Sequence, residues 1–248
     1  MYAIIGGSGL AKLAALERTR RQVMRTPYGE PSGALTFGTL GGAEVVFLAR
    51  HGYGHTIAPH EINYRANIWA LKNLEVQGVL AVATVGGVRE QFGPGVLAVP
   101  DQIIDYTHGR KATFFEGSEA PVTHVDFTWP YSAALRARLL AAAKQAGEPV
   151  HDGGVYACTQ GPRLETAAEI ARIRRDGGEL VGMTGMPEAA LAREAGLAYA
   201  ALAVVVNHAA GLGDSREAIR LEDLEAVMKS AVTRAVRVLA AAVQPEAA

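Results

Sequence analysis

The chain alternates short apolar runs with longer segments whose apolar residues recur at helical spacing. Most of the short runs are apolar throughout, which is typical of strands that are covered on both faces. Repeated alternation of strand and helix predicts a single α/β domain, in which a mixed, mostly parallel central sheet is flanked by helices. We expect strands at residues 2–5, 44–49, 78–84, 96–99, 154–159, 180–184 and 198–206. We expect helices at residues 63–77, 132–146, 166–176, 187–195 and 222–242.

Size and charge limit the kind of protein. The chain has 248 residues, of which 49% are hydrophobic and 20% charged, so residues 1–243 are long enough to form one large domain with a sizeable core. We expect the short tail at 244–248 to be disordered. The formal net charge of −1 gives no reason to expect nucleic acid or an anionic membrane as a partner, because both attract concentrated positive charge.

The start of the chain and its cysteine content indicate the compartment. The single cysteine, Cys158, excludes an internal disulfide bond, and Met1 leads directly into a predicted strand without the pattern of a signal peptide. No apolar run approaches the roughly 20 residues that are needed to cross a bilayer. We therefore expect a cytoplasmic protein that makes no contact with a membrane.

Polar and glycine-rich segments follow several predicted strands. Arg50 and His51 come directly after the strand at 44–49, and glycines with hydroxyl residues follow three others, at 6–9, 84–87 and 184–185. An arginine offers a planar fork of donors that can meet two phosphate oxygens, and glycine permits close approach of the backbone to a ligand. Because ligands of such sheets bind beyond the carboxyl ends of the strands, these segments predict one shared phosphate pocket.

Other kinds of site fit these residues less well. Residues 6–9 do not form a dinucleotide-binding fingerprint, and the same segment lacks the final glycine of a serine nucleophile elbow. His51, His55 and His60 show no recognised metal-ligand spacing, and Pro59 interrupts any helix that would align them. Cys158 lies in an apolar predicted strand without a histidine nearby in sequence, which favours a buried core thiol over a nucleophile.

An ordered set of motifs, spread from about residue 2 to about residue 240, resembles one enzyme family. The motifs lie at 6–9, 50–52, 59–71, 101–105, 160–166 and 182–188. In this order they are similar to the trimeric purine nucleoside phosphorylases, and specifically to the methylthioadenosine phosphorylase branch. The resemblance implies a nucleoside phosphorylase domain over 1–243, a homotrimer with active sites near subunit interfaces, and reversible phosphorolysis of a purine nucleoside. It also implies that phosphate is a co-substrate and that neither an organic cofactor nor a metal is needed.

The resemblance also implies roles for individual residues. Ser8, Arg50, His51 and Thr184 would hold phosphate, with help from the backbone at Ala83 and Thr84. The substrate-binding positions would include Val85, Gly86, Met183 beside the ribose, Leu164 against the purine, and His124 reaching the 5′ substituent in a neighbouring subunit. Catalysis would rest on Arg50, His51 and Asn207. A held phosphate would act as nucleophile and as electrostatic partner of the cationic sugar, so Arg50→Ala should damage turnover far more than folding.

The chain departs from the family pattern at the last predicted strand end, 204–211. Adenine-cleaving relatives carry aspartates at the positions of Asn207 and Ala209. A neutral amide at Asn207 can donate to O6 and accept from N7–H of a 6-oxopurine, whereas Ala209 offers no acceptor to an exocyclic amine. This pattern favours hypoxanthine over adenine. The alternative is that Asn207 is only a turn residue after the strand.

The residues before and within the last predicted helix indicate the 5′ group. Ile219, Leu221 and Leu224 fall where this branch lines an apolar pocket, and a methylthio group gains from apolar burial while a 5′-hydroxyl needs a polar partner. We therefore expect cleavage of 5′-methylthioinosine to hypoxanthine and 5-methylthioribose 1-phosphate, a reaction of purine salvage. The alternatives are a general 6-oxopurine (inosine/guanosine) phosphorylase, a methylthioadenosine phosphorylase, a nucleosidase that uses water, and a non-catalytic nucleoside or phosphate sensor.

Overall fold

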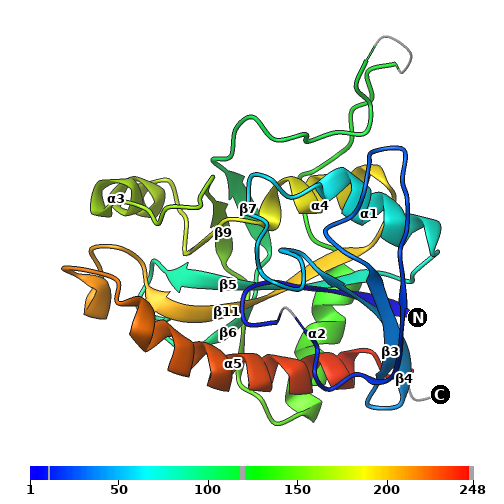
Figure 1. Cartoon of the computed structure of the whole chain (residues 1–248). Helices are drawn as coiled ribbons and strands as arrows, with labels where there is room; N and C mark the ends of the chain where they lie inside the picture. Colours follow the sequence, from blue (N-terminus) through cyan, green and yellow to red (C-terminus); the bar gives the residue numbers. More distant parts are fainter. Residues whose placement is uncertain (11, 118–120, 246–248) are drawn as a thin grey trace.

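The computed structural model describes residues 1–10, 12–117 and 121–245, and at positions 221 and 223 the backbone alone. The described residues form an eleven-stranded mixed sheet with helices on both faces (Figure 1), which confirms the predicted fold class. The strands are β1 (Tyr2–Gly6), β2 (Glu17–Gln22), β3 (Leu35–Leu40), β4 (Ala43–Ala49), β5 (Val79–Gly87), β6 (Leu97–Val99), β7 (Gln102–Asp105), β8 (Val150–Asp152), β9 (Val155–Cys158), β10 (Leu180–Gly182) and β11 (Tyr199–His208). The helices are α1 (Tyr64–Asn73), α2 (Ala133–Gln145), α3 (Ala167–Arg175), α4 (Gly185–Glu194), the 3-10 turn η1 (Gly213–Ser215) and α5 (Leu221–Ala242).

Strand β5 lies at the centre of the sheet, where it pairs with β1, β10 and β11. The main path runs in the order β2-β3-β4-β1-β5-β10-β9-β7, and β11 pairs with both β5 and β6. The pairs β1–β4, β1–β5 and β5–β11 are parallel, so their carboxyl ends lie at one edge. Antiparallel pairs occur at β2–β3, β3–β4, β5–β10 and β6–β11. The parallel centre therefore brings the ends of four long strands, β1, β4, β5 and β11, together.

Four strands were not predicted from the sequence. The fully exposed edge strand β2 has the sequence of residues 17–22, which is polar and arginine-rich and has no apolar alternation. Neighbouring β3 contains a glycine at its centre, and β7 and β8 are short. These strands form because a neighbouring strand offers backbone partners, which local apolar patterning does not reveal. The predicted strand at 180–184 ends at Gly182, because Thr184 is the residue that precedes α4.

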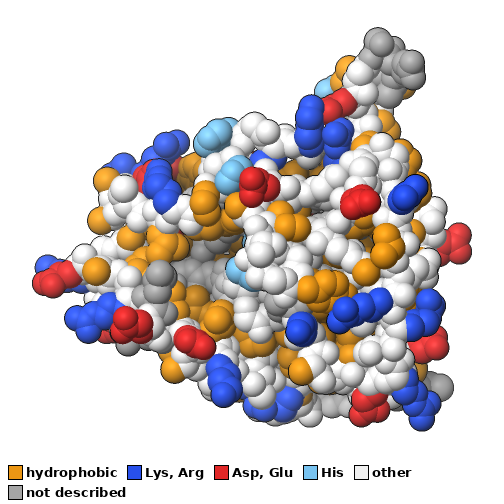
Figure 2. Space-filling model, viewed as in Figure 1, with side chains coloured by type: hydrophobic (Ala, Val, Ile, Leu, Met, Phe, Trp, Pro, Cys, Tyr) orange, Lys and Arg blue, Asp and Glu red, His pale blue; other side chains and the backbone are white. Residues whose placement is uncertain are grey.

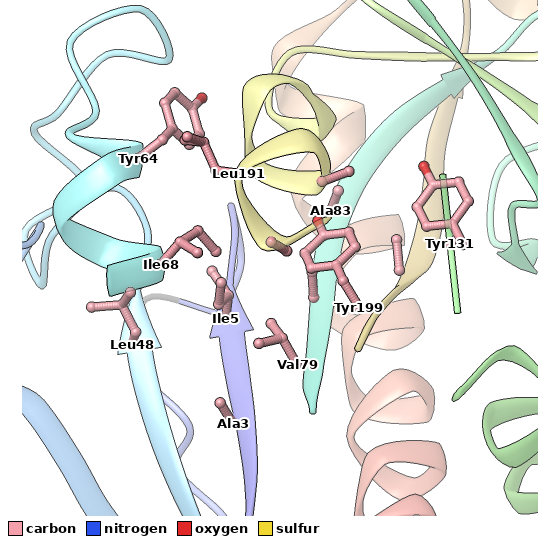
Figure 3. Packing of buried hydrophobic residues seen from close by; sticks show 14 of the residues in the cluster. Ala3, Ile5, Leu48, Tyr64, Ile68, Val79, Ala83, Tyr131, Leu191 and Tyr199 are labelled. Carbon is pink, nitrogen blue, oxygen red and sulfur yellow. The ribbon is translucent and has the colours of Figure 1, made fainter. Parts of the chain in front are cut away.

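The core has two layers, one on each face of the sheet. Successive residues of a strand point to opposite faces, so Ile4 and Leu80 pack under α2 and α5, whereas Ile5 and Ala81 pack under α1 and α4. Figure 3 shows the second layer, where Ile68 of α1 lies beside Ile5. Complete burial of such an aliphatic side chain stabilises the fold by about 1.5–3 kcal/mol. The two layers cover the middle of the sheet, and at the carboxyl ends of its central strands the beginning of α5 lies over an open space.

Near the end of the described residues, Gln244 contacts the body of the domain, and disorder of the tail at 244–248 stays a prediction. The side-chain amide of Gln244 donates to the backbone oxygens of Gly41 and Ala240, at 3.0 and 2.9 Å. Gln244 is thus attached to the β3–β4 turn, and residues 246–248 lie outside the described part of the chain. Within the described residues, no helix has the length and apolar character that crossing a membrane requires.

Candidate active site

A cavity of about 800 Å³ opens where the central strands end. Its wall consists of the last residues of β5, β10 and β11 and of segments that follow β1, β4, β9, β10 and β11, and the beginning of α5 covers one side. On the face shown in Figure 2, hydrophobic side chains gather around a hollow between α5 and α3, and histidine side chains lie near it. Small-molecule sites commonly have this size and this mixture of apolar wall and few polar groups.

Most of the residues predicted from the sequence line this single cavity. They are Ser8, Arg50, His51, Ala83, Thr84, Val85, Gly86, Leu164, Met183, Thr184, Asn207, Ala209, Ile219 and Leu224. The exposed residue His124 is not among the lining residues of its own chain. The side chain of Leu221 lies outside the described part of the structure.

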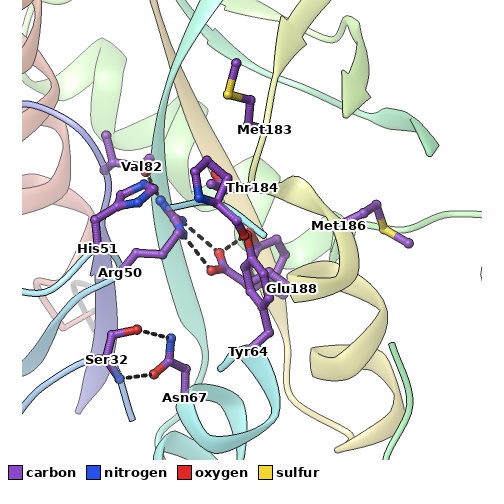
Figure 4. Close-up of polar contacts among 12 residues, drawn as sticks. Ser32, Arg50, His51, Tyr64, Asn67, Val82, Met183, Thr184, Met186 and Glu188 are labelled. Carbon is purple, nitrogen blue, oxygen red and sulfur yellow. Dashed lines mark hydrogen bonds and ion pairs between the residues drawn. The ribbon is translucent and has the colours of Figure 1, made fainter. Parts of the chain in front are cut away.

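Arg50 is buried and is paired with a carboxylate. Only 1% of its surface is exposed, and Glu188 of α4 is fully buried beside it. Nε of Arg50 donates to Oε2 of Glu188 at 2.7 Å, and Nη2 donates to Oε1 at 2.8 Å (Figure 4). Nη1 donates to the backbone oxygen of Val82 at 2.9 Å. A buried guanidinium needs a nearby anion, and Glu188 supplies it here. The predicted contact of Arg50 with phosphate therefore depends on the N–H groups that these bonds leave.

Part of the guanidinium group nevertheless remains available. An arginine has five N–H bonds, and after these three hydrogen bonds one N–H on Nη1 and one on Nη2 have no protein partner among the described residues. Burial works against the charge of Arg50, but the attraction of Glu188 outweighs it and raises the pKa of Arg50 above its ordinary value. The cavity therefore contains a permanent cation with two donors left for a ligand.

Gly7 lies directly against this group. A Cβ atom at position 7 would come within 2.8 Å of the backbone oxygen of Val82 and 2.9 Å of Nη1 of Arg50. Any larger residue would displace the arginine or the loop after β1. The close approach brings the backbone before Ser8 beside the cationic end of Arg50, as expected for an oxyanion cradle.

His51 is neutral at physiological pH. Its Nδ1 lies 2.8 Å from the backbone oxygen of Ile57, and because a carbonyl oxygen only accepts, Nδ1 carries the proton. Burial, followed by the charge of Arg50, lowers the pKa of His51 to about 4. Nε2 is therefore an acceptor. In this state His51 accepts at Nε2 from a P–O–H group of phosphate or an O–H group of a sugar.

His55 is a lining residue to which the sequence analysis gave no role in the pocket. Its ring centroid lies 4.6 Å from that of His51, and its Nε2 lies 3.4 Å from Oγ of Ser8. Its backbone has a φ of 52°, in the left-handed region that residues other than glycine adopt uncommonly. The signal was present in the sequence, since His55 belongs to the same polar segment as Arg50 and His51.

A neutral amide, that of Asn207, also lines the cavity. Asn207 follows a bulge in β11, because the pairing with β5 shifts register between Val205 and Asn207. Its Nδ2 donates to the backbone oxygen of His208 at 2.6 Å, which leaves the second N–H and Oδ1 without a partner among the described residues. Ala209 is 1% exposed and adds only a methyl group to this wall.

Apolar residues of α5 close a further side of the cavity. Leu224 and Met228 are four residues apart and therefore share one face of the helix. The side chain of Met228 reaches the loop after β1, where a Cβ atom on Gly9 would lie 2.8 Å from its Cγ. Met228 was not predicted from the sequence, although its helical spacing from Leu224 could have revealed it.

The only cysteine does not take part in this chemistry. Cys158 is completely buried at the end of β9, and burial raises the pKa of its thiol to about 12. A thiol in this state is not a nucleophile at physiological pH. Among the described residues, no group of three or more His, Cys, Asp and Glu side chains is arranged to hold a metal ion.

Comparisons with known protein families, sequences and structures all find phosphorylases. A model of the Phosphorylase superfamily matches residues 1–244. The chain is 57% identical over 225 residues to a probable S-methyl-5'-thioinosine phosphorylase from Xanthomonas campestris pv. campestris, with 91% of this chain and 90% of the relative covered. It is 50% identical over 219 residues to a 6-oxopurine nucleoside phosphorylase from Pyrococcus furiosus, with 86% and 82% covered. A solved methylthioadenosine phosphorylase from Schistosoma mansoni in complex with adenine is similar with a TM-score of 0.92 and 32% identity, covering 98% of this chain and 90% of that one.

Proposed function

Because the chain belongs to the phosphorylase superfamily, we propose that it cleaves the N-glycosidic bond of 5′-methylthioinosine with phosphate. The products are hypoxanthine and 5-methylthioribose 1-phosphate. The observation that carries this proposal is a single cavity that joins a buried cation, a neutral amide and an apolar helix face. These three groups fit the phosphate, the 6-oxopurine and the methylthio end of one nucleoside.

Phosphate binds at the Arg50 end in this proposal. Ser8, Thr184 and the backbone near Thr84 supply further donors there. As the bond to the purine breaks, positive charge develops on the sugar, and an anion held beneath it stabilises the transition state and then forms the new C–O bond. Removing one well-placed donor from such a site typically raises the barrier by about 3–4 kcal/mol.

The purine lies at the Asn207 end. The free N–H and Oδ1 of the Asn207 amide match O6 and N7–H of hypoxanthine. Ala209 leaves the amino group of adenine without an acceptor, and a buried polar group without a partner costs about 1–3 kcal/mol. The site therefore favours 6-oxopurines over adenine by about tenfold to hundredfold.

The 5′ group lies against α5. Ile219, Leu224 and Met228 give this part of the cavity an apolar surface, on which a methylthio group is buried favourably. A 5′-hydroxyl gains less against these three side chains, because it loses water on apolar burial. Glu225 of α5 also lines the cavity, so a hydroxyl finds a polar partner there only where it reaches that carboxylate. This difference favours 5′-methylthioinosine over inosine.

The assembly and surroundings of the enzyme are part of the same proposal. We propose a cytoplasmic homotrimer that needs no organic cofactor or metal, in which His124 of one subunit reaches the 5′ group in the next. The exposed position of His124, away from the cavity of its own chain, is consistent with this role.

A product assay on a small nucleoside panel tests the function. Purified protein is incubated with 5′-methylthioinosine, inosine and methylthioadenosine at equal concentrations, with and without phosphate, and free base and sugar phosphate are quantified. The expected result is release of hypoxanthine only with phosphate, fastest from 5′-methylthioinosine. Faster cleavage of inosine would support a general 6-oxopurine phosphorylase, and faster cleavage of methylthioadenosine would refute the assignment of the base site. Base release without phosphate would indicate a nucleosidase. No base release from any of the nucleosides would support a non-catalytic nucleoside or phosphate sensor.

A further inference from the structure

A buried ion pair stands behind the phosphate end of the cavity. Arg50 is 1% exposed and Glu188 is completely buried, and two hydrogen bonds of 2.7 and 2.8 Å join them. Glu188 is not a lining residue of the cavity, so it cannot touch a ligand there. Arg50 is the part of the pair that faces the cavity.

A third buried residue holds the carboxylate. The hydroxyl of Tyr199 donates to Oε1 of Glu188 at 2.8 Å, and Tyr199 is 3% exposed. The three residues come from three elements, with Arg50 after β4, Glu188 on α4 and Tyr199 at the start of β11. The carboxylate therefore accepts three hydrogen bonds from two neighbours, which fixes its position more firmly than a single contact would.

This arrangement decides which edge of Arg50 the ligand meets. Glu188 occupies the edge formed by Nε and Nη2, and Val82 takes one N–H of Nη1. One N–H on Nη1 and one on Nη2 remain, and these are the two donors that Arg50 can offer to two oxygens of an oxyanion. Without the carboxylate of Glu188 the guanidinium would keep a single hydrogen bond, to Val82, which fixes its orientation less firmly than three do.

We propose that Glu188 is a positioning residue for phosphate, which fixes the Nη1–Nη2 edge of Arg50 toward the anion, and that Tyr199 in turn fixes Glu188. The inference rests on the proposed function, because it assumes that phosphate is the ligand at Arg50. A buried ion pair typically contributes little net stability, because the desolvation of both charges offsets most of their attraction. A positioning role gives the pair of Arg50 and Glu188 a function other than stability.

Two variants and one matched control test the inference. Glu188→Gln keeps the shape of the side chain but has one acceptor oxygen instead of two. Its amide nitrogen would face an N–H group of Arg50 as a second donor, so one of the two hydrogen bonds is lost. Tyr199→Phe removes only the hydroxyl that holds Glu188. Tyr131→Phe is the control, because Tyr131 is also buried, stacks on Tyr199 with ring centroids 6.1 Å apart, and has a hydroxyl without a partner among the described residues.

The measurements are the Kd of inorganic phosphate by titration calorimetry and the KM values of phosphate and nucleoside. We expect Glu188→Gln to raise the Kd and KM of phosphate by at least about tenfold, and Tyr199→Phe by about threefold, since hydrogen bonds to charged groups have this strength. The KM of the nucleoside should change by less than about threefold, and Tyr131→Phe should change none of these values. Thermal unfolding shows which variants are folded. If Glu188→Gln does not fold, the comparison of phosphate binding by Tyr199→Phe and Tyr131→Phe tests the inference.

Three results would overturn the inference. Unchanged or tighter phosphate binding by folded Glu188→Gln would show that the carboxylate only balances charge. An equal effect of Tyr199→Phe and Tyr131→Phe on phosphate would reduce the role of Tyr199 to core stability. If the unchanged protein binds no phosphate, the proposed function fails and the inference fails with it. If the unchanged protein binds phosphate and the variants bind it with the same Kd, only the inference is refuted.

Discussion

At the scale of single residues, the buried pair of Arg50 and Glu188 links stability to chemistry. The sequence suggested that Arg50→Ala would damage turnover far more than folding. The structure changes this expectation, because the substitution leaves the carboxylate of Glu188 buried without its cation. Breaking a buried pair on one side typically costs about 3–5 kcal/mol.

We therefore expect Arg50→Ala to lower the free energy of unfolding by about 3–5 kcal/mol and to lower kcat/KM as well. The double variant Arg50→Met with Glu188→Leu should recover most of the stability, because it removes both charges, but none of the activity. Urea unfolding and steady-state kinetics measure the two quantities. Recovery of activity in the double variant would exclude Arg50 from phosphate binding.

The neutral state of His51 predicts a dependence of stability on pH. In the unfolded chain the imidazole has its ordinary pKa of about 6.5, whereas the pKa in the folded protein is about 4. Between these values the unfolded state binds more protons, so the contribution of His51 to stability is complete above about pH 6.5 and declines as the pH falls toward 4. The loss is on the order of 2–3 kcal/mol.

Urea unfolding at pH 7, 5.5 and 4.5 checks this expectation. His51→Asn should show a smaller loss of unfolding free energy over this range than the unchanged protein. His60→Asn serves as the control, because His60 is exposed. If His51→Asn loses as much stability as the unchanged protein, the imidazole is not held neutral.

The base site predicts a change of substrate. Asn207→Asp with Ala209→Asp introduces the two carboxylates that the family resemblance implies for adenine-cleaving relatives at these positions. Both positions line the cavity, and an added acceptor there can bind the amino group of adenine. We expect the ratio of kcat/KM for methylthioadenosine to that for 5′-methylthioinosine to rise by about tenfold or more. An unchanged ratio would mean that the purine edge does not lie against these residues.

At the scale of elements, helix α3 stands out by the way it begins. Oγ1 of Thr166 accepts from the backbone N–H of Glu169 at 3.1 Å, and the Glu169 carboxylate accepts from the backbone N–H of Thr166 at 2.7 Å. This reciprocal capping box satisfies two N–H groups. Helix α2 has a simpler start, in which Oγ of Ser132 accepts from Leu135 N at 3.3 Å.

Removal of the cap should destabilise the protein more at α3 than at α2. We expect Thr166→Ala to lower the free energy of unfolding by about 1 kcal/mol. Ser132→Ala should lower it by less, because it loses one longer hydrogen bond. Urea unfolding of both variants measures the difference. The reverse order would show that the box contributes nothing beyond a single cap.

At the scale of the whole molecule, a long segment after β7 projects from the body (Figure 1). It carries exposed apolar side chains, with exposed fractions of 81% for Val122 and 63% for Trp129. Large exposed apolar residues that gather on one segment are typical of a contact surface. They support the proposed homotrimer.

We expect light scattering with size exclusion to give a mass of three times the 26.1 kDa chain. Val122→Asp with Trp129→Glu should reduce this mass and the activity together, because a charge buried at an interface without a partner is unfavourable. Val23→Asp is the matched control, since Val23 is 74% exposed but lies far from this segment in sequence. A monomeric, fully active parent protein would refute the trimer.

The fold could be predicted largely because its signals are local. Apolar runs marked the central strands β1, β4, β5 and β11 and the helices between them, and these elements were confirmed. The edge strand β2 was missed because its polar residues carry no apolar period, and its pairing with β3 is what makes it a strand. The same reasoning gathered the glycine-marked strand ends into one cavity, because parallel strands end at one edge.

By itself, the sequence determined the central strands and helices, the family resemblance and most of the residues that reach the cavity, since each follows from the identity of neighbouring residues. The tertiary structure alone decided that Glu188 and Tyr199 stand behind Arg50 and that His51 is neutral. Arg50 and Glu188 are 138 positions apart. Charge pairing and the pKa of a buried group depend on distance and on the exclusion of water, and both arise only when distant segments pack together.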